Sequence, residues 1–281
     1  MGSGLSSTSD RLDGVVRPSV AARTEGQLSS RPDTVAIQSG ALKLDGLLWH
    51  PGGRGPFPSI LFSHGIGAEL ERQLMQVATL GPVFSSHGYL FLCVFRRGPG
   101  LSSGQGTSAT DIMERVVAVN GQEARNSLGL PEADQLSDAL AGLEFLRSLP
   151  DVDRRRVALV GHSFGASLTL LMAEHDTTIR AAVLFSGSAS SWEFSPKLRA
   201  RLLAAIGRMT APVFYIQAAN DYSVAPAKEL SAEMARLGKP YRVRVYPPVG
   251  ETAEEGHEFL YRGVELWEED VFDFLDGYTK R

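Results

Sequence analysis

The sequence predicts an α/β protein with one mostly parallel sheet of about eight strands and helices on both of its faces. From residue 34 onward, strand-like and helix-like segments alternate, and the connections between most of them are short. Such alternation is typical of parallel strands joined by helical crossovers. The chain has 281 residues, of which 43% are apolar, and this is enough for one large domain with a well-filled core.

The strands begin with an antiparallel edge and continue as buried, largely apolar segments. Residues 34–38 and 42–50 alternate apolar and polar side chains, which predicts a hairpin that turns at Ser39 and Gly40. The wholly apolar residues 89–95 are typical of a strand in the middle of a parallel sheet. In chain order, the predicted strands are 34–38, 42–50, 58–65, 89–95, 156–161, 180–187, 212–221 and 241–248.

Helical periodicity marks the segments between these strands. In residues 134–150, Leu136, Leu140, Leu143 and Leu146 recur at helical spacing, and a proline closes the segment. In chain order, the predicted helices are 71–88, 111–119, 134–150, 167–175, 196–209, 227–238 and 265–278.

Two segments stand apart from this alternation. Residues 1–33 are rich in serine, arginine and glycine, which predicts a flexible N-terminal arm. Residues 102–135 are too long for an ordinary connection and predict a small helical insertion. The insertion is interpreted either as a small cap that overhangs the site or as a packed structural element without substrate contact.

Composition excludes several classes of function. A net charge of −4 gives no electrostatic basis for binding nucleic acid, and the densest basic run, residues 154–156, is interpreted as a solvated loop. No apolar run reaches the ~20 residues that span a bilayer, and residues 1–33 lack the apolar stretch of a secretory signal. We therefore expect a cytoplasmic protein without nucleic-acid or membrane partners. The lone cysteine, Cys93, lies in an apolar strand and is not expected to be a nucleophile.

Ser163 lies in the motif Gly-His-Ser-Phe-Gly, between a predicted strand and a predicted helix. A nucleophile on a strand-to-helix turn has this G-x-S-x-G pattern, because its strained backbone needs small neighbours at Gly161 and Gly165. Amides at the start of the helix would favour negative charge at the turn. Five residues alone leave an alternative, in which Ser163 is an ordinary helix N-cap.

A base and an orienting carboxylate follow in the order that favours the nucleophile. Asp221 comes directly after the penultimate predicted strand, and His257 lies in the loop after the last one. The order Ser163, Asp221, His257 is that of the α/β-hydrolase triad, and the three residues follow different strands. Asp221 taken alone could be the N-cap of the helix that follows it.

The remaining features complete a candidate acyl-transfer site. The amides of Ile66 and Phe164 are the candidate oxyanion donors, one after the glycine turn at 64–65 and one after Ser163. His162 is interpreted as a packed residue of the turn and His64 as structural. Arg96 and Arg97 are interpreted as structural, with a substrate carboxylate as the alternative partner. No dinucleotide fingerprint or metal-ligand cluster is present, so no cofactor and no metal are expected.

Five segments together resemble a known family: LFSHGIGA, FRRGPGLSSG, LPDVDRRRVALVGHSFGA, QAANDYSVAP and EEGHEFLYRG. From about residue 34 to 278 the chain resembles the α/β-hydrolase superfamily, and within it the dienelactone hydrolase family and the related prolyl-oligopeptidase-like esterases. The resemblance implies an α/β-hydrolase domain over residues 34–281. There is one departure, because dienelactone hydrolase proper has cysteine in the motif where this chain has Ser163. That difference favours a general carboxylic-ester hydrolase.

The expected activity is therefore hydrolysis of a small-molecule carboxylic ester or lactone through an acyl-enzyme. The alternatives are a thioesterase, amidase, perhydrolase or peptidase on the same triad, or a catalytically silent hydrolase fold that only binds. Trp192 and Tyr222 lie next to these positions in the sequence and are the candidate substrate-binding residues. The oligomeric state is left open, with a homodimer as one alternative.

Overall fold

The structure is a computed structural model that describes residues 31–67, 69–98, 100–126, 129–131 and 133–280. Most of the predicted N-terminal arm, residues 1–30, lies outside the described residues. The first strand, β1, begins at Asp33, where the arm was expected to end.

A single sheet of eight strands runs through the described part of the chain, as predicted, in the order β1-β2-β4-β3-β5-β6-β7-β8. The first two strands form the antiparallel hairpin, which turns at Gly40 with a positive φ of 56°. β2 also pairs antiparallel with β4, and every other neighbouring pair is parallel. The strands are β1 Asp33–Ser39, β2 Leu42–Trp49, β3 Phe57–Ser63, β4 Leu90–Val94, β5 Val152–His162, β6 Ala182–Phe185, β7 Val213–Ala218 and β8 Tyr241–Tyr246.

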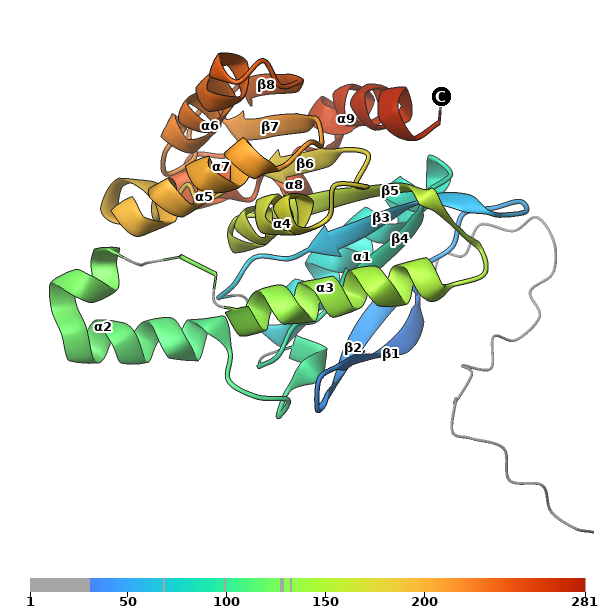
Figure 1. Cartoon of the computed structure of the whole chain (residues 1–281), viewed down its shortest axis with the longest axis horizontal. Coiled ribbons are helices and arrows are strands. Elements are labelled where there is room, and N and C mark those ends of the chain that lie inside the picture. The colour runs from blue at the N-terminus through green and yellow to red at the C-terminus, as the bar shows by residue number, and fades with distance from the viewer. Residues whose placement is uncertain (1–30, 68, 99, 127–128, 132, 281) are drawn as a thin grey trace, which may run out of the picture.

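Helices cover both faces of this sheet (Figure 1). Helices α3 to α6 pack on one face, and α1, α8 and α9 pack on the other. The helices are α1 Leu70–Ser86, α2 Ala109–Asn126, α3 Ala133–Ser148, α4 Phe164–His175, α5 Pro196–Arg208, α6 Ala225–Arg236, α7 Ala253–His257, α8 Phe259–Arg262 and α9 Val264–Thr279, with short 3-10 turns at η1 Gly100–Ser102 and η2 Trp192–Phe194.

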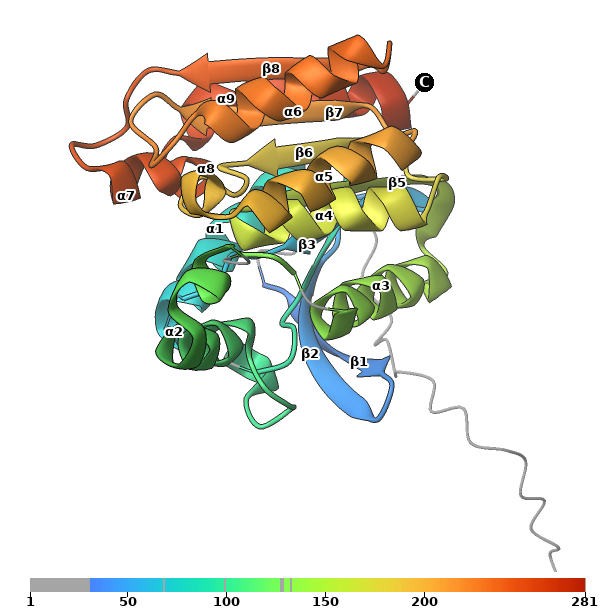
Figure 2. The ribbon, with the colours of Figure 1, turned by 60° about the vertical axis from the view of Figure 1, so that its left-hand side comes forward.

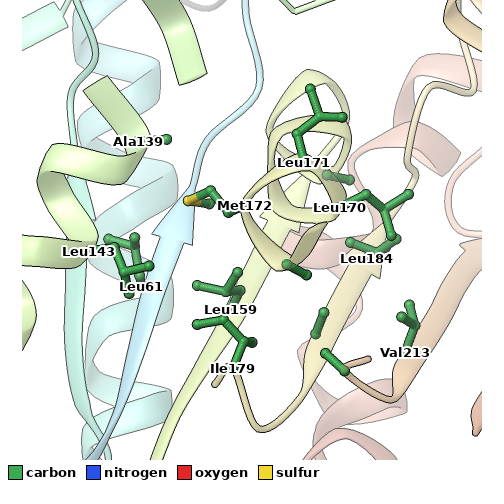
Figure 3. Packing of buried hydrophobic residues seen from close by; sticks show 14 of the residues in the cluster. Leu61, Ala139, Leu143, Leu159, Leu170, Leu171, Met172, Ile179, Leu184 and Val213 are labelled. Atoms are coloured by element: carbon green, nitrogen blue, oxygen red, sulfur yellow. The ribbon is translucent and has the colours of Figure 1, made fainter. Parts of the chain in front are cut away.

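The apolar core has two halves, one on each face of the sheet. In β5, Leu159 contributes to the half under α4, whereas Ala158 and Val160 contribute to the other half. This alternation follows from the pleat of a strand, in which successive side chains point to opposite faces. Figure 3 shows the first half, with Leu170 and Met172 of α4 packed among side chains of the sheet and α3. Helices cover both faces, so the central strands β4 and β6 are wholly apolar and buried, as parallel strands usually are.

The predicted helical insertion, residues 102–135, begins at the last residue of η1 and contains α2. Helix α2 has a kink at Gly121, where φ is 42° and ψ is −99°. Figures 1 and 2 show α2 standing out from the layers, beyond the carboxyl ends of the parallel strands. The prediction of a helix at 111–119 is therefore confirmed, and α2 is longer than predicted at both ends.

The interpretation of the basic run 154–156 as a loop is wrong. β5 begins at Val152 and includes all three arginines, because the strand extends past the sheet's buried centre into solvent. Arg155 is exposed, and Arg156 pairs with Asp153 at 2.8 Å. Charged residues lower the strand propensity that a sequence pattern detects, although an exposed strand end tolerates them.

At Gly81 of α1 we expect alanine to destabilise the protein, which is the opposite of its usual effect in a helix. Alanine normally stabilises a helix interior by about 1 kcal/mol relative to glycine. At Gly81, however, a Cβ would lie 2.2 Å from the ring of the buried Trp49. We expect Gly81→Ala to lower the free energy of unfolding by about 1–3 kcal/mol in urea, because overpacking displaces the ring.

Gly277 of α9 provides the matched control, since a Cβ there would meet no atom within 4 Å. Gly277→Ala should raise the free energy of unfolding by about 0.5–1 kcal/mol. Equal effects of the two substitutions would contradict the packing of α1 on Trp49.

Candidate active site

Ser163 lies on a tight turn between β5 and α4, with φ of 55° and ψ of −119°. A residue with a side chain rarely adopts this conformation, which costs about 1–3 kcal/mol. The turn leaves no room for larger neighbours. A Cβ at Gly161 would lie 2.4 Å from Thr169 Oγ1, and a Cβ at Gly165 would lie 1.9 Å from the carbonyl oxygen of Ser63. Both glycines of the motif are therefore required by packing, as the sequence predicted.

The side chain of Ser163 does not cap α4, although the residue occupies the N-cap position. Its Oγ instead lies 2.8 Å from Nε2 of His257, which is 94 positions away in the chain. Ser163 is therefore the N-cap of α4 by position, but its side chain bonds to His257 and not to the helix. The amide of Phe164, the first residue of α4, has no carbonyl partner within the helix, because the first turn of any helix lacks one.

A second hydrogen bond continues from His257 to Asp221. The imidazole Nδ1 lies 2.8 Å from Asp221 Oδ1, and the side chain of Asp221 is 0% exposed. Two further donors hold that carboxylate in place: the backbone N–H of Tyr222 at 2.7 Å and Gln217 Nε2 at 3.0 Å. Helix α6 has Val224 as its N-cap, so the capping alternative for Asp221 is excluded.

The three residues meet because each follows a different strand at the same edge of the sheet. Ser163 follows β5 and Asp221 follows β7, as predicted. His257 comes after β8, but it ends the short helix α7 rather than lying in a loop. Thr252 and Glu255 form a capping box at the start of α7, with two reciprocal hydrogen bonds. This local signal was present in the sequence and would have predicted the helix.

Contacts with His162 and Asn220 fix the backbone around His257. His162 Nε2 donates to the carbonyl oxygen of His257 at 2.8 Å, and His162 itself is buried. A Cβ at Gly256 would lie 2.5 Å from Asn220 Oδ1, so α7 packs directly on the loop that carries Asp221. The interpretation of His162 as a packed residue of the turn is confirmed.

Burial of His162 leads to a prediction about stability and pH. Desolvation, and then the nearby His257, lower the pKa of His162 to about 3, whereas an unfolded histidine titrates near 6.5. Below pH 6.5 the unfolded chain therefore binds a proton that the folded chain excludes, and stability falls as the pH falls toward 3. We expect this residue to remove about 2 kcal/mol of unfolding free energy between pH 6 and pH 4.5.

The measurement is urea unfolding of the wild type and His162→Gln at both pH values. Glutamine keeps a donor for the carbonyl of His257 but does not titrate, so the variant should lose less stability in acid. His175→Gln is the control, because His175 is exposed at the end of α4. A pH dependence that is the same in all three proteins would contradict the prediction.

The loop after β3 is held from behind by the buried Arg96. Its Nη2 donates to the carbonyl oxygens of His64 at 2.9 Å and Gly65 at 3.4 Å, and its guanidinium lies 5.6 Å from the ring centre of Phe164. Arg97 instead pairs with Asp138 at 2.8 Å. The structural interpretation of both arginines agrees with these contacts.

A cavity of about 240 Å³ opens beside Ser163. It is lined by His64, Gly65, Ile66, Gly67, Arg72, Gln73, Gln76, His162, Ser163, Ser190, Tyr222, Glu254, His257 and Glu258. Its wall includes Ile66, a candidate oxyanion donor, and Tyr222, a candidate substrate-binding residue. The Tyr222 ring lies edge-on to the imidazole of His257, with ring centres 5.2 Å apart.

Trp192 requires a correction, because it does not line this cavity. Its side chain is fully buried, in the half of the core that includes residues of α4 and α5. The side chain of Phe164 is also absent from the wall, since it packs against Ala109 and Leu168. Nearness in sequence to the strand ends was the only basis for including Trp192, and it does not determine which way a side chain points.

The sequence pattern did not indicate the charged residues of the cavity rim. Arg72 of α1 pairs with Glu254 of α7 at 3.1 Å and with Glu258. These two carboxylates raise the pKa of Arg72. The pairs join segments more than 180 positions apart, so local sequence could not reveal them.

The lone cysteine, Cys93, is buried in the core. Burial raises the pKa of the Cys93 thiol to about 12, so this thiol stays protonated in the core. Within the described residues, no cluster of histidine, cysteine or carboxylate side chains has the arrangement of a metal site. Over the same residues, no helix combines the length and apolar character needed to cross a membrane.

Comparison with known proteins identifies the family. Residues 96–269, from Arg96 into the first part of α9, match the model of the dienelactone hydrolase family. The chain belongs to the dienelactone hydrolase family. This family membership and the eight-stranded sheet make it an α/β hydrolase.

Relatives of this chain are distant. It is 26% identical over 176 residues to the quorum-quenching protein AidA of Acinetobacter baumannii, a match that covers 61% of this chain and 50% of AidA. The chain thus spans half the length of that relative. An esterase of Pyrococcus furiosus has a TM-score of 0.64 at 16% identity, with 92% of this chain and 96% of the esterase covered. Acylaminoacyl peptidase of Pyrococcus horikoshii has a TM-score of 0.62 at 19% identity, over 89% of this chain and 42% of the peptidase. At these identities, the structural likeness shows the fold.

Proposed function

We propose that the protein is a serine hydrolase that cleaves carboxylic esters, lactones included, through an acyl-enzyme on Ser163. His257 takes the hydroxyl proton as Ser163 Oγ attacks the ester carbonyl, and it then gives that proton to the leaving alcohol. Water next attacks the acyl-enzyme with His257 again as base, which releases the acid and restores Ser163. Asp221 orients the imidazole and stabilises its cation.

Negative charge that develops on the carbonyl oxygen needs donors that are already in place. The amides of Ile66 and Phe164 are the proposed donors. Ile66 lines the cavity beside Ser163, and Phe164 begins α4, whose first amides lack helical partners. Arg96 supports this arrangement by holding the loop that leads to Ile66.

One observation carries the proposal: two hydrogen bonds of 2.8 Å join Ser163, His257 and Asp221, and they start from a serine with positive φ. Positive φ alone does not mark a nucleophile, since Ser186 has a similar φ of 54°, but the hydrogen bonds that run from Ser163 through His257 to Asp221 do. The motif has serine where dienelactone hydrolase proper has cysteine, which favours general esters over dienelactones.

The test is a panel of p-nitrophenyl esters, a matched thioester and a matched p-nitroanilide, with kcat/KM measured for each. We expect the esters and a simple lactone to be hydrolysed with higher kcat/KM than the anilide. A higher kcat/KM for the anilide would favour an amidase or peptidase. A protein that hydrolyses none of these substrates, and that a fluorophosphonate does not label at Ser163, would be a binding protein with a hydrolase fold.

A further inference from the structure

We propose that the ester carries no negative charge, and that it extends from the cavity at Ser163 into a second cavity next to it. This inference rests on the proposed function, because it concerns the substrate of the same site. It depends on three features of the structure: the junction of the two cavities, the charges in their walls, and the hydrogen bonds and ion pairs that the nearby arginines already make.

The second cavity is the larger one, with a volume of about 510 Å³. Gly67 lines both cavities, and a Cβ there would meet no atom within 4 Å, so no side chain crowds the position that the two cavities share. The second cavity is lined by Gly67, Glu69, Leu70, Gly98, Gly100, Ser103, Gly104, Gly106, Ser108, Thr110 and Asp111. Helix α2 contributes to this wall through its first turn, so the insertion borders the extended site.

Carboxylates outnumber cations in these walls. Among the described residues that line the two cavities, four carboxylates (Glu69, Asp111, Glu254 and Glu258) stand against one guanidinium, that of Arg72. Arg72 Nη2 already meets both Glu254 and Glu258. A cleft lined by an excess of one charge attracts ligands of the opposite charge and repels those of the same charge.

Arg96 and Arg97 lie near the cavities but outside their walls, and both already bind other groups. Arg96 is 3% exposed, and its Nη2 donates to two backbone carbonyls behind the loop after β3. Arg97 pairs with Asp134 at 2.9 Å and with Asp138 at 2.8 Å. Neither residue lines a cavity. The one guanidinium open to an anionic substrate is therefore that of Arg72, whose charge is already balanced by two carboxylates.

The first experiment compares three p-nitrophenyl esters of equal length whose acyl chains end in a trimethylammonium, a neutral or a carboxylate group. We expect kcat/KM to fall in the order cationic, neutral, anionic, with the anionic ester lower than the neutral one by about tenfold or more. Raising the salt to 1 M should reduce the differences, because the Debye length falls to about 3 Å. An anionic ester that is the best substrate, or three equal values, would overturn the proposal.

A charge-reversal variant locates the effect. Glu69→Lys should raise kcat/KM for the anionic ester and lower it for the cationic one, with the neutral ester as the internal reference. Glu265→Lys is the matched control, because Glu265 is exposed in the first turn of α9 and lies outside both cavities. An identical response of the two variants would show that the net charge of the protein, and not the cavity, sets the preference.

A filling variant tests the extension into the second cavity. Ser103 is exposed in the wall of that cavity, so Ser103→Trp should obstruct it without touching the core. We expect kcat/KM for a p-nitrophenyl ester with a ten-atom chain to fall at least tenfold, while that for the acetate stays within twofold. Equal changes for both esters, or none for the long one, would overturn this part.

These outcomes are distinguishable from failure of the proposed function. If no ester of any charge is hydrolysed and Ser163 is not labelled by a fluorophosphonate, the hydrolase assignment itself fails. If esters are hydrolysed and Ser163 is labelled, but charge and chain length have no effect, only the inference about the substrate fails.

Discussion

We expect the Ser163→Ala variant to lose about 10⁶-fold in kcat for p-nitrophenyl acetate while it keeps its fold. The hydroxyl is the attacking group, and its Oγ is the atom that His257 Nε2 contacts. Alanine has no atom in its place. Alanine has the same backbone preferences as serine at φ of 55°, so the strain of the turn is unchanged. Circular dichroism and urea unfolding would show whether the fold is kept.

Ser186 offers a closely matched control for this substitution. It is also a buried serine with a positive φ, 54°, and it follows a neighbouring strand. Its Oγ has no hydrogen-bond partner within the described part of the chain, and the residue lies outside the cavity beside Ser163. Ser186→Ala should therefore keep wild-type kcat. Activity that survives in Ser163→Ala would contradict the assignment of the nucleophile.

The second large effect is expected for Asp221→Asn, which should lower kcat by about 10⁴-fold. The carboxylate accepts hydrogen bonds on both oxygens, from His257 and the Tyr222 amide on Oδ1 and from Gln217 on Oδ2. An amide group has one acceptor atom and one donor atom, so one side would face another donor in either orientation. The charge that stabilises the imidazolium is also lost.

Asp273→Asn is the control for the loss of a carboxylate charge, because Asp273 of α9 pairs with Arg242 on the exposed surface. We expect this variant to keep wild-type kcat. A loss below tenfold at pH 7 would contradict an orienting role for Asp221.

Much of the fold could be predicted from the sequence, because strands buried on both faces and amphipathic helices leave distinct patterns. The apolar residues of β4 and the leucine spacing of α3 are examples. The first half of β5 could not be predicted, since Arg154, Arg155 and Arg156 occupy a strand end whose side chains reach solvent. Strand pairing stabilises such residues, and a pattern of side chains does not record pairing.

The candidate triad was predictable for a different reason. Parallel strands end at one edge of the sheet, so residues that directly follow β5 and β7 must approach each other. The pocket was harder to predict, because its wall depends on side-chain direction and on contacts between distant segments. Trp192 was wrongly assigned because the sequence does not show which way its side chain points. The pairs of Arg72 with Glu254 and Glu258 were missed because they join segments that are far apart in the chain.

The most direct test of the proposed chemistry is rapid-quench mass spectrometry of the wild-type protein during turnover of p-nitrophenyl butyrate. Acid quenching in the pre-steady state should trap a butyryl adduct, and fragmentation should locate it on Ser163. The Asp221→Asn protein, in which both chemical steps are slow, serves as the comparison. Ester turnover with no adduct, or with the acyl group on another residue, would contradict hydrolysis through an acyl-enzyme on Ser163.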